Sequence, residues 1–394
     1  MNSKVILSGL LAIFLLGSCT TRNAVRVATS KNPALALKSI AQSRAQSYLH
    51  DPELVLSDIR QAQGQYNRLL GVLRGESGAK WGKQEAEKIP TRTRYVKYTE
   101  NYKNRVTVDF DSGSILIEHL DEERAKEKLR NAVVTALLTP GDPRAVDLFS
   151  DKEIPLGGTP YLQGMVADQN GQLIENRADA EAYAAYLVNN DLRTRQINVN
   201  GQGKQVDYVE FAMINTHVEK RALKYAPQVR KYAASRQISR SLVFAVIKTE
   251  SGFNPFAVSS APAYGLMQLV PSSGGRDAYR KVTGIDQPPS KEYLFDAENN
   301  IELGTTYLNI LLNDSQLQDI TNPLSREYCA IAAYNTGPSN VLRAFSGNQD
   351  AAIRTINSMR PDEVYGTLRR KLPYAETRNY IVKVVSEQKR FSTL

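Results

Sequence analysis

Hydrophobic and polar residues follow two different periodicities along the chain. Between about residues 51 and 215, several short stretches alternate apolar and polar positions, as half-buried strands do. After residue 216, longer segments with helical spacing follow one another and are separated by short polar breaks. We therefore predict an α+β N-terminal domain over residues 51–215 and a mostly α-helical domain over residues 216–394.

The strand-like stretches of the first domain are short and are bounded by turn residues. Residues 111–114 (DSGS) separate two of them, and residues 201–203 (GQG) separate another two. Both groups contain glycine, which permits the tight reversal of a hairpin, so two hairpins are predicted. The predicted strands are 94–98, 105–110, 115–118, 196–199 and 206–209.

Two helices are expected in the same domain. The first begins with Pro52 at its first helical position, carries apolar residues at helical spacing as far as Leu73, and ends at Gly75. The second is amphipathic, covers residues 125–137, and ends before Pro140. The first domain shows no catalytic pattern, so an accessory role in positioning or binding is predicted for it.

The beginning of the chain has the form of an export signal. Lys4 precedes an apolar run over residues 5–16, which is too short to span a bilayer. The run is followed by two small residues directly before Cys19. This ending resembles the bacterial lipobox, in which the cysteine becomes the lipidated first residue. The alternative is a plain secretory signal with an incidental cysteine.

The lipobox resemblance implies a signal peptide over residues 1–18 and lipid on Cys19. More than one acyl chain gives durable membrane attachment. Thr20 rather than aspartate follows the cysteine, which by the bacterial sorting rule implies an outer-membrane anchor with the protein on the periplasmic face. The polar stretch that follows carries no pattern, and residues 19–50 are predicted to be a tether.

The composition is that of a folded protein with a cationic excess. The 394 residues are 42% hydrophobic and 23% charged, and the formal net charge is +9. A cationic balance favours an anionic partner such as a membrane surface, an acidic polymer or a nucleic acid. Because the sequence has neither a basic block interleaved with aromatic residues nor zinc-finger spacing, nucleic acid is not expected.

Cysteines and histidines are too few to define a framework. Cys19 and Cys329 do not make a disulfide scaffold, and the histidines show no metal-ligand spacing. We therefore expect neither a metal nor another cofactor, and a Ser-His-Asp triad is not favoured. Cys329 lies in an apolar stretch and is predicted to be a buried free thiol.

The candidate chemistry lies in the second domain, at Glu250. Ser239 is a suitable N-cap for a helix that is apolar nearly all round over residues 242–247, and Gly252 can end it. Glu250 then lies in the last turn of a buried helix, where desolvation and the helix dipole raise a carboxyl pKa. A general acid for glycosidic cleavage needs such a group. A glutamate on a solvated face is the alternative.

Motifs downstream of Glu250 favour the catalytic interpretation. They are ESGFNPFAVS at 250–259, GLMQ at 265–268, AYNTG at 333–337 and ETRNY at 376–380. In this order and spacing they resemble the catalytic domain of the Slt-type lytic transglycosylases, which has a goose-lysozyme-like helical fold. The resemblance covers about residues 220–390. The lipobox and the α+β domain narrow it to the membrane-bound members of the family.

The resemblance implies roles for individual residues. Glu250 matches the single catalytic glutamate of the family, and the glycan strands of peptidoglycan are the implied substrate. The positions that match substrate-binding residues of the family are Ser259, Met267, Gln268, Tyr334, Asn335 and Tyr380.

The same resemblance implies a reaction with one carboxyl group, although most glycosidases use two. Glu250 would protonate the leaving oxygen of the β-1,4 bond between N-acetylmuramic acid and N-acetylglucosamine. The muramoyl 6-hydroxyl would then attack and leave a 1,6-anhydromuramoyl end. Asp296 and Glu302 follow a helix-start pattern and are expected to cap or solvate that helix. The alternatives are a lysozyme-type hydrolase, which needs a second carboxylate across the cleft, and a non-catalytic peptidoglycan-binding lipoprotein.

Overall fold

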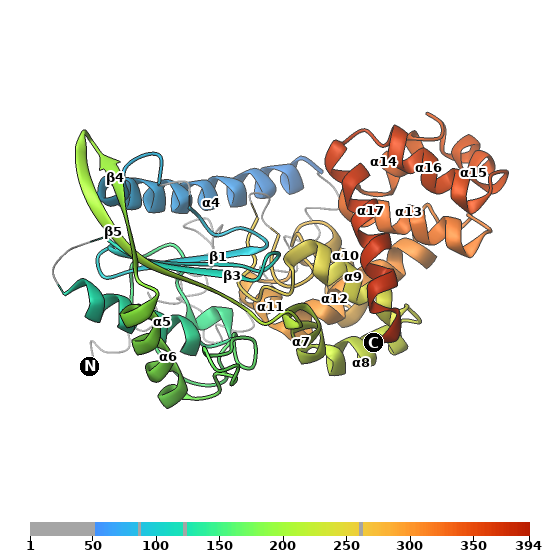
Figure 1. Cartoon of the computed structure of the whole chain (residues 1–394). Coiled ribbons are helices and arrows are strands. Elements are labelled where there is room, and N and C mark those ends of the chain that lie inside the picture. Colours follow the sequence, from blue (N-terminus) through green and yellow to red (C-terminus); the bar gives the residue numbers. More distant parts are fainter. Residues whose placement is uncertain (1–51, 86–87, 121–123, 260–262) are drawn as a thin grey trace, which may run out of the picture.

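A five-stranded antiparallel sheet forms the centre of the N-terminal half (Figure 1). The computed structural model describes residues 52–85, 88–120, 124–259 and 263–394. The predicted strands and both hairpins are confirmed. In the sheet order β1-β2-β3-β5-β4 the strands are β1 Arg94–Thr99, β2 Asn104–Asp109, β3 Ser114–His119, β5 Gln202–Ala212 and β4 Arg193–Val199.

The turn between β2 and β3 is a point of contact between the two halves of the chain. Gly113 in this turn has a φ of +76°, and a Cβ at this position would lie 2.9 Å from Nε2 of His217. His217 begins α7 (His217–Lys224), the first helix of the second half. Glycine is therefore required both for the backbone conformation and for the close approach of the helix.

Helix α4 (Pro52–Trp81) crosses one face of the sheet and extends beyond it toward the second half (Figure 1). Leu73 and Trp81 are fully buried and pack with Tyr98 of β1. The predicted helix end at Gly75 is wrong. Burial of the following turns against the sheet outweighs the roughly 1 kcal/mol that a glycine costs inside a helix.

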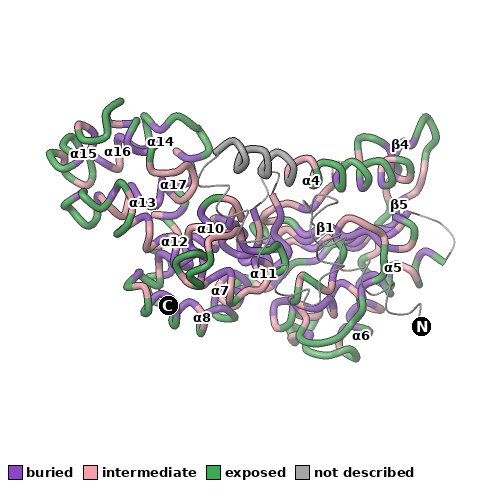
Figure 2. Tube along the Cα trace, turned by 180° about the vertical axis from the view of Figure 1, so that it is seen from behind, coloured by how far each residue is buried: buried purple, intermediate pink, exposed green. Residues whose placement is uncertain are grey.

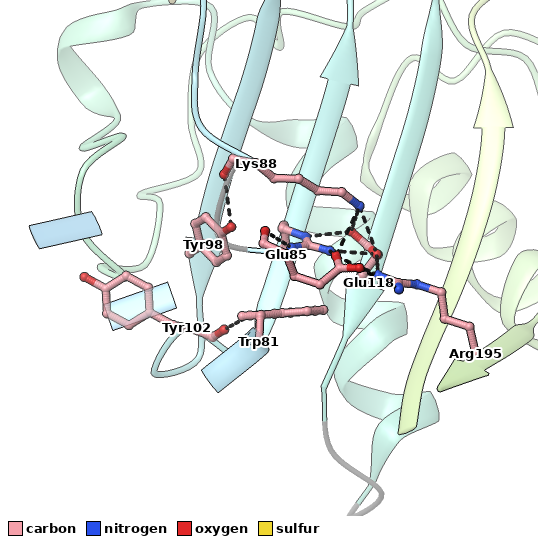
Figure 3. Close-up of polar contacts among 8 residues, drawn as sticks. Trp81, Glu85, Lys88, Tyr98, Tyr102, Glu118 and Arg195 are labelled. Carbon is pink, nitrogen blue, oxygen red and sulfur yellow. Dashed lines mark hydrogen bonds and ion pairs between the residues drawn. The ribbon is translucent and has the colours of Figure 1, made fainter. Parts of the chain in front are cut away.

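A buried charge cluster attaches the end of α4 to the sheet (Figure 3). Arg105 and Glu118, on neighbouring strands, are buried and share hydrogen bonds of 2.7 and 2.9 Å. Arg195 of β4 pairs with Glu118 at 2.9 Å, and Glu85 pairs with Arg105 at 2.8 Å. The Arg105 guanidinium also lies 4.0 Å from the centroid of the Trp81 ring. Because a buried charge that loses its partner is strongly unfavourable, the pairing keeps the end of α4 in a defined position on the sheet.

Two helices cover the opposite face of the sheet, α5 (Ala125–Leu138) and α6 (Arg177–Asn190). The predicted amphipathic helix corresponds to α5 and is confirmed. Helix α6 was not predicted from the sequence, because its buried face includes two alanines and gives little amphipathic contrast. Its start does carry a local signal, because Asn176 and Asp179 form a capping box.

The second half consists of helices packed around α9 (Arg240–Ser251) and α17 (Ala375–Arg390). Figure 2 shows buried residues through the middle of this half and along the sheet, and exposed residues along the outer side of α4. The predicted helical character is confirmed. The other helices of this half are α8 Ala226–Ser235, α10 Gly274–Thr283, α11 Lys291–Phe295, α12 Ala297–Asn313, α13 Pro323–Thr336, α14 Pro338–Arg343, α15 Gln349–Asn357 and α16 Pro361–Lys371.

The ends of α9 agree with the sequence prediction, with one difference. Gly252 ends the helix in the left-handed conformation, with a φ of 60°. Ser239 occupies the N-cap position, but its hydroxyl makes no capping hydrogen bond. It lies 2.7 Å from the hydroxyl of Ser241 instead.

Two smaller predictions in the helical half are also confirmed. Cys329 is a free, fully buried thiol, and burial raises its pKa to about 12. Asp296 caps α12 by accepting hydrogen bonds from the amides of Glu298 and Asn299. Glu302 lies inside the same helix.

Candidate active site

A cavity of about 1280 Å³ opens between the two halves of the chain. Its walls come from α4, from the segment that leads into β1, and from α9, α13 and α17. The volume exceeds the roughly 300–1,000 Å³ usual for small-ligand pockets, which indicates an extended ligand.

Glu250 lies in the last turn of α9 beside this cavity and is only 5% exposed. Burial raises the pKa of its carboxyl group to about 7. Arg92 and Tyr380 oppose this increase, and the negative charge of Glu376 adds to it. A carboxyl group that titrates near neutral pH can both give up and take back a proton, as a general acid and base must.

Two tyrosines of different helices lie beside Glu250. Tyr334 of α13 donates from its hydroxyl to the main-chain carbonyl of Met267 at 2.8 Å. Tyr380 of α17 is 4% exposed, and its hydroxyl interacts with Glu250 and lowers the pKa of that carboxyl group. Burial raises the pKa of both phenols well above its usual value, and the charge of Glu250 contributes further. Both tyrosines therefore remain neutral over the range in which Glu250 titrates.

Arg92 comes from the N-terminal half and reaches the same carboxyl group. Its Nη1 lies 3.5 Å from Oε2 of Glu250, and its Nη2 lies 3.3 Å from Oε1 of Glu376. Arg92 could not be found from the sequence, because no motif surrounds it and it precedes Glu250 by a long stretch of chain. The N-terminal half therefore contributes directly to the electrostatics of Glu250, a contribution that the sequence did not indicate.

A second arginine connects the end of α9 to the sheet. The buried guanidinium of Arg221 donates to the carbonyl of Phe110, at 2.7 Å, and to the carbonyl of Gly252. Next to this contact, Lys248 of α9 forms a 2.7 Å ion pair with Asp111. The last turn of α9, and Glu250 with it, is thus fixed relative to the N-terminal half.

The GLMQ motif forms a tight loop that presents Gln268 to the cavity. Gly265 has a φ of +75°, and a Cβ there would lie 2.3 Å from both the Leu294 carbonyl oxygen and Nδ2 of Asn300. The buried Asn300 side chain accepts from the amide of Met267 at 2.7 Å and donates to the Leu294 carbonyl at 2.9 Å. The helix-start pattern at Asp296 gave no sign that the Asn300 side chain supports this loop.

Gln268 itself is anchored by one end of its side-chain amide. Its Nε2 donates to the carbonyl of Gly265 at 2.8 Å. Its buried Oε1 has no hydrogen-bond partner within the described part of the chain. Since buried polar atoms are normally paired, this oxygen is a candidate acceptor for a ligand hydroxyl or amide.

The other predicted site residues divide into two groups. Ser259 and Asn335 line the cavity, and Asn335 accepts a 2.7 Å hydrogen bond from the hydroxyl of Thr377. Met267 is fully buried and packs on Gly304, where a Cβ would lie 2.3 Å from its sulfur. Met267 and Tyr380 are therefore close to the site but are not among the residues that line the cavity.

The predicted lipidation residue, Cys19, lies outside the described residues. Over residues 52–85, 88–120, 124–259 and 263–394, no cluster of three or more His, Cys, Asp or Glu residues could hold a metal ion. In the same ranges, no helix combines the length and hydrophobicity that a membrane span requires.

Two family models match successive parts of the chain. Residues 57–224 match the family model for the N-terminal domain of membrane-bound lytic murein transglycosylase C. Residues 227–357 match the transglycosylase SLT domain.

The curated relatives match most of the chain, whereas the solved structure matches less than half of it. Membrane-bound lytic murein transglycosylase C of Histophilus somni (strain 2336) is 41% identical over 80% of this chain and 84% of that protein. Its counterpart in Haemophilus influenzae (strain PittEE) is 42% identical over 79% and 85%. The solved lytic transglycosylase Slt of Pseudomonas aeruginosa is 28% identical, with a TM-score of 0.33, over 43% of this chain and 24% of that one. The match thus spans about a quarter of that solved chain.

Proposed function

The chain belongs to the membrane-bound lytic murein transglycosylase C family, and from this premise we propose that Glu250 is the acid and base of its reaction. The protein is a peptidoglycan lytic transglycosylase, as the sequence motifs indicated. One observation carries the assignment to Glu250: its carboxyl group is buried beside the cavity, with a pKa of about 7. Such a group is protonated in a substantial fraction of molecules at neutral pH.

In the first step Glu250 gives its proton to the oxygen between N-acetylmuramic acid and N-acetylglucosamine. The bond between this oxygen and the anomeric carbon of the muramoyl residue breaks, and its electron pair stays on the oxygen. The N-acetyl group of the substrate stabilises the oxocarbenium-like carbon. Tyr380, which lowers the pKa of Glu250, would stabilise the carboxylate that this step creates.

In the second step the carboxylate of Glu250 takes the proton of the muramoyl 6-hydroxyl. The oxygen of this hydroxyl attacks the anomeric carbon and closes a 1,6-anhydro ring. Glu250 ends the cycle protonated, and no water is consumed. The reaction therefore needs one group that titrates near neutrality rather than two carboxyl groups with separate roles.

The other carboxyl groups on the cavity do not offer an evident second catalyst. Asp111 is paired with Lys248 at 2.7 Å, Glu376 lies 3.3 Å from Arg92, and Glu387 lies 3.9 Å from Arg390. Interaction with Lys248 lowers the pKa of Asp111, although burial opposes this change. These pairings support the non-hydrolytic reaction over the lysozyme-type hydrolase.

We propose that some of the remaining residues bind the glycan and that the others hold these residues or Glu250 in position. Ser259, Gln268 and Asn335 would bind sugar hydroxyl or N-acetyl groups from the cavity wall. Tyr334 and Tyr380 would orient Glu250, and Tyr334, which lines the cavity, would also contact the reacting sugar. Met267 would support Tyr334 through its main-chain carbonyl, which accepts the tyrosine hydroxyl.

We also propose that the two halves of the chain form domains with different roles. Residues 51–215 would form a domain that supplies one wall of the glycan cleft, and residues 216–394 would form the catalytic domain. Arg92 supports this assignment, because it belongs to the first half and approaches Glu250 of the second.

Membrane association is a property of this family, whose relatives are described as membrane-bound. We propose that the attachment is a lipid on Cys19, with a signal peptide over residues 1–18 and a tether over residues 19–50. The protein would then be held at the periplasmic face of the outer membrane. Mass spectrometry of the mature N-terminus tests this, and an unmodified Cys19 would rule it out.

Digestion of purified murein sacculi tests the catalytic assignment. The wild type should release muropeptides with 1,6-anhydromuramoyl ends, and Glu250→Gln should release none. Glu298→Gln is a matched control, because this glutamate is 48% exposed, pairs with Lys231, and does not line the cavity. Reducing ends from the wild type would show a hydrolase, and full activity of Glu250→Gln would remove Glu250 from its role.

A further inference from the structure

The Arg92 side chain is fixed at its main chain and exposed at its tip. Its carbonyl accepts a 3.0 Å hydrogen bond from Nδ2 of the buried Asn254, and the adjacent Thr93 carbonyl accepts one from the amide of Phe110 at 2.9 Å. The Arg92 side chain itself is 39% exposed and lines the cavity. Asn254 follows Glu250 closely in the chain, so the main chain of Arg92 and the candidate acid are held in one unit.

The contacts of the Arg92 guanidinium are longer than strong charge-assisted hydrogen bonds. Its distances of 3.5 Å to Glu250 and 3.3 Å to Glu376 exceed the roughly 2.7–2.9 Å of such bonds. The Glu376 side chain is 66% exposed, so solvent screens that pair. A carboxylate presented from the cavity could therefore replace either partner and form a shorter, bidentate pair with Arg92.

We propose that Arg92 is a positioning residue that pairs with Glu250 and Glu376 in the empty cleft and transfers to a carboxylate of the incoming glycan strand. The inference rests on the transglycosylase function proposed above and adds to it a residue of the N-terminal half that recognises the charge of the substrate. Arg92 would act on the chemistry through Glu250.

The transfer changes the electrostatic surroundings of Glu250 when the acid is needed. Arg92 and Tyr380 favour its charged form, Glu376 disfavours that form, and Tyr334 also lies beside it. When the Arg92 guanidinium turns to a substrate carboxylate, one stabilising cation moves away from Glu250. The protonated form then becomes more favourable, so the bound substrate promotes protonation of the acid.

Two parts of a murein strand can supply the carboxylate. One is the stem peptide, and the other is the lactyl group of muramic acid where the peptide has been removed. Both present a carboxylate to Arg92. Treatment of the strands with an amidase, which removes the peptides, distinguishes the two sources.

The first test compares the pH dependence of strand cleavage in two variants. Arg92→Gln removes a cation from Glu250, so the loss of activity at alkaline pH should move upward by about one pH unit. Glu376→Gln removes an anion, so that Arg92 interacts with Glu250 alone. The loss of activity at alkaline pH should then move to lower pH. A structural defect is not expected to shift the alkaline limb of the pH profile in opposite directions in the two variants. An unchanged alkaline limb in both variants would overturn the proposal.

The second test measures the KM of soluble murein strands before and after methyl esterification of their carboxyl groups. Esterification should raise the KM of the wild type about tenfold, the effect of losing one charge-assisted hydrogen bond. The KM of Arg92→Gln should be high and nearly insensitive to esterification, with Arg92→Lys between the two. Equal sensitivity of the wild type and Arg92→Gln to esterification would overturn the proposal.

Amidase-treated strands identify the source of the carboxylate. If Arg92→Gln raises KM only for peptide-bearing strands, the stem peptide supplies it; if only for treated strands, the lactyl group does. If KM is raised for neither substrate, the proposal fails. Should Arg92→Gln not fold, as judged by thermal unfolding, Glu376→Gln at its exposed position still decides the outcome through its pH limb. A wild type that forms no anhydromuramoyl ends would instead reject the proposed function itself.

Discussion

The guanidinium of Arg221 donates a hydrogen bond to the carbonyl of Gly252, the residue that ends the helix carrying Glu250. The same guanidinium donates to Phe110 at the end of the hairpin strand β2. A single buried side chain thus connects the catalytic helix to the N-terminal sheet. The position of Glu250 relative to Arg92 depends on this connection.

Replacing Arg221 with methionine should destabilise the protein by about 2–4 kcal/mol. The change keeps an apolar side chain of comparable length but leaves the carbonyls of Phe110 and Gly252 without their donor. Urea unfolding monitored by circular dichroism measures the loss. Arg177→Met is the control, because its exposed pair with Glu181 should contribute less than about 1 kcal/mol. Equal losses in the two variants would contradict this interpretation.

Gly265→Ala should abolish activity. It should also lower the free energy of unfolding by more than the positive φ of this residue alone would cause. A Cβ would collide with the Leu294 carbonyl and with Asn300, and both hold the loop that positions Gln268. Gly284→Ala is a matched control: its φ of +73° is nearly the same, but nothing lies within 4 Å of its added Cβ. The control should lose only about 1–2 kcal/mol and remain active. Thermal unfolding and sacculus digestion of both variants decide between them.

The activity of the wild type should fall as pH rises through about 7, because Glu250 must be protonated to start the reaction. The midpoint of the alkaline limb of kcat/KM reports the pKa of this group in the free enzyme. An initial-rate profile on soluble strands at constant ionic strength measures it. A midpoint near 4.5, the ordinary value for glutamate, would show that burial does not control the acid.

Glu250→Gln should make the protein more stable at pH 8 and have little effect at pH 4. The folded-state pKa of Glu250, about 7, lies above the ordinary value of 4.5. The contribution of the Glu250 carboxyl group to the free energy of unfolding is therefore fully present below about pH 4.5 and is lost as pH rises through about 7. The difference corresponds to about 3 kcal/mol at pH 8. Urea midpoints of both proteins at the two pH values test this, and a difference independent of pH would contradict it.

Local patterns in the sequence predicted most of the secondary structure. Alternation predicted the strands, amphipathic spacing predicted α5, and an apolar run between Ser239 and Gly252 predicted α9. Gly252 marks the end of α9, because its left-handed backbone conformation is readily adopted by glycine. The errors have physical causes: α4 continues past Gly75 because Trp81 is buried against the sheet, and α6 presents little amphipathic contrast.

The sequence by itself determined the helix that carries Glu250, because its apolar run and the glycine that ends it are local features. The class of reaction followed from the resemblance of its motifs to those of a known family. Only the tertiary structure placed Arg92 against Glu250, joined Gly252 to Phe110 through Arg221, and moved Met267 from the cavity wall into the core. Such contacts join segments far apart in the chain. They form only when both cores have packed, because the spacing of residues within one segment does not specify which distant side chain will neutralise its charge.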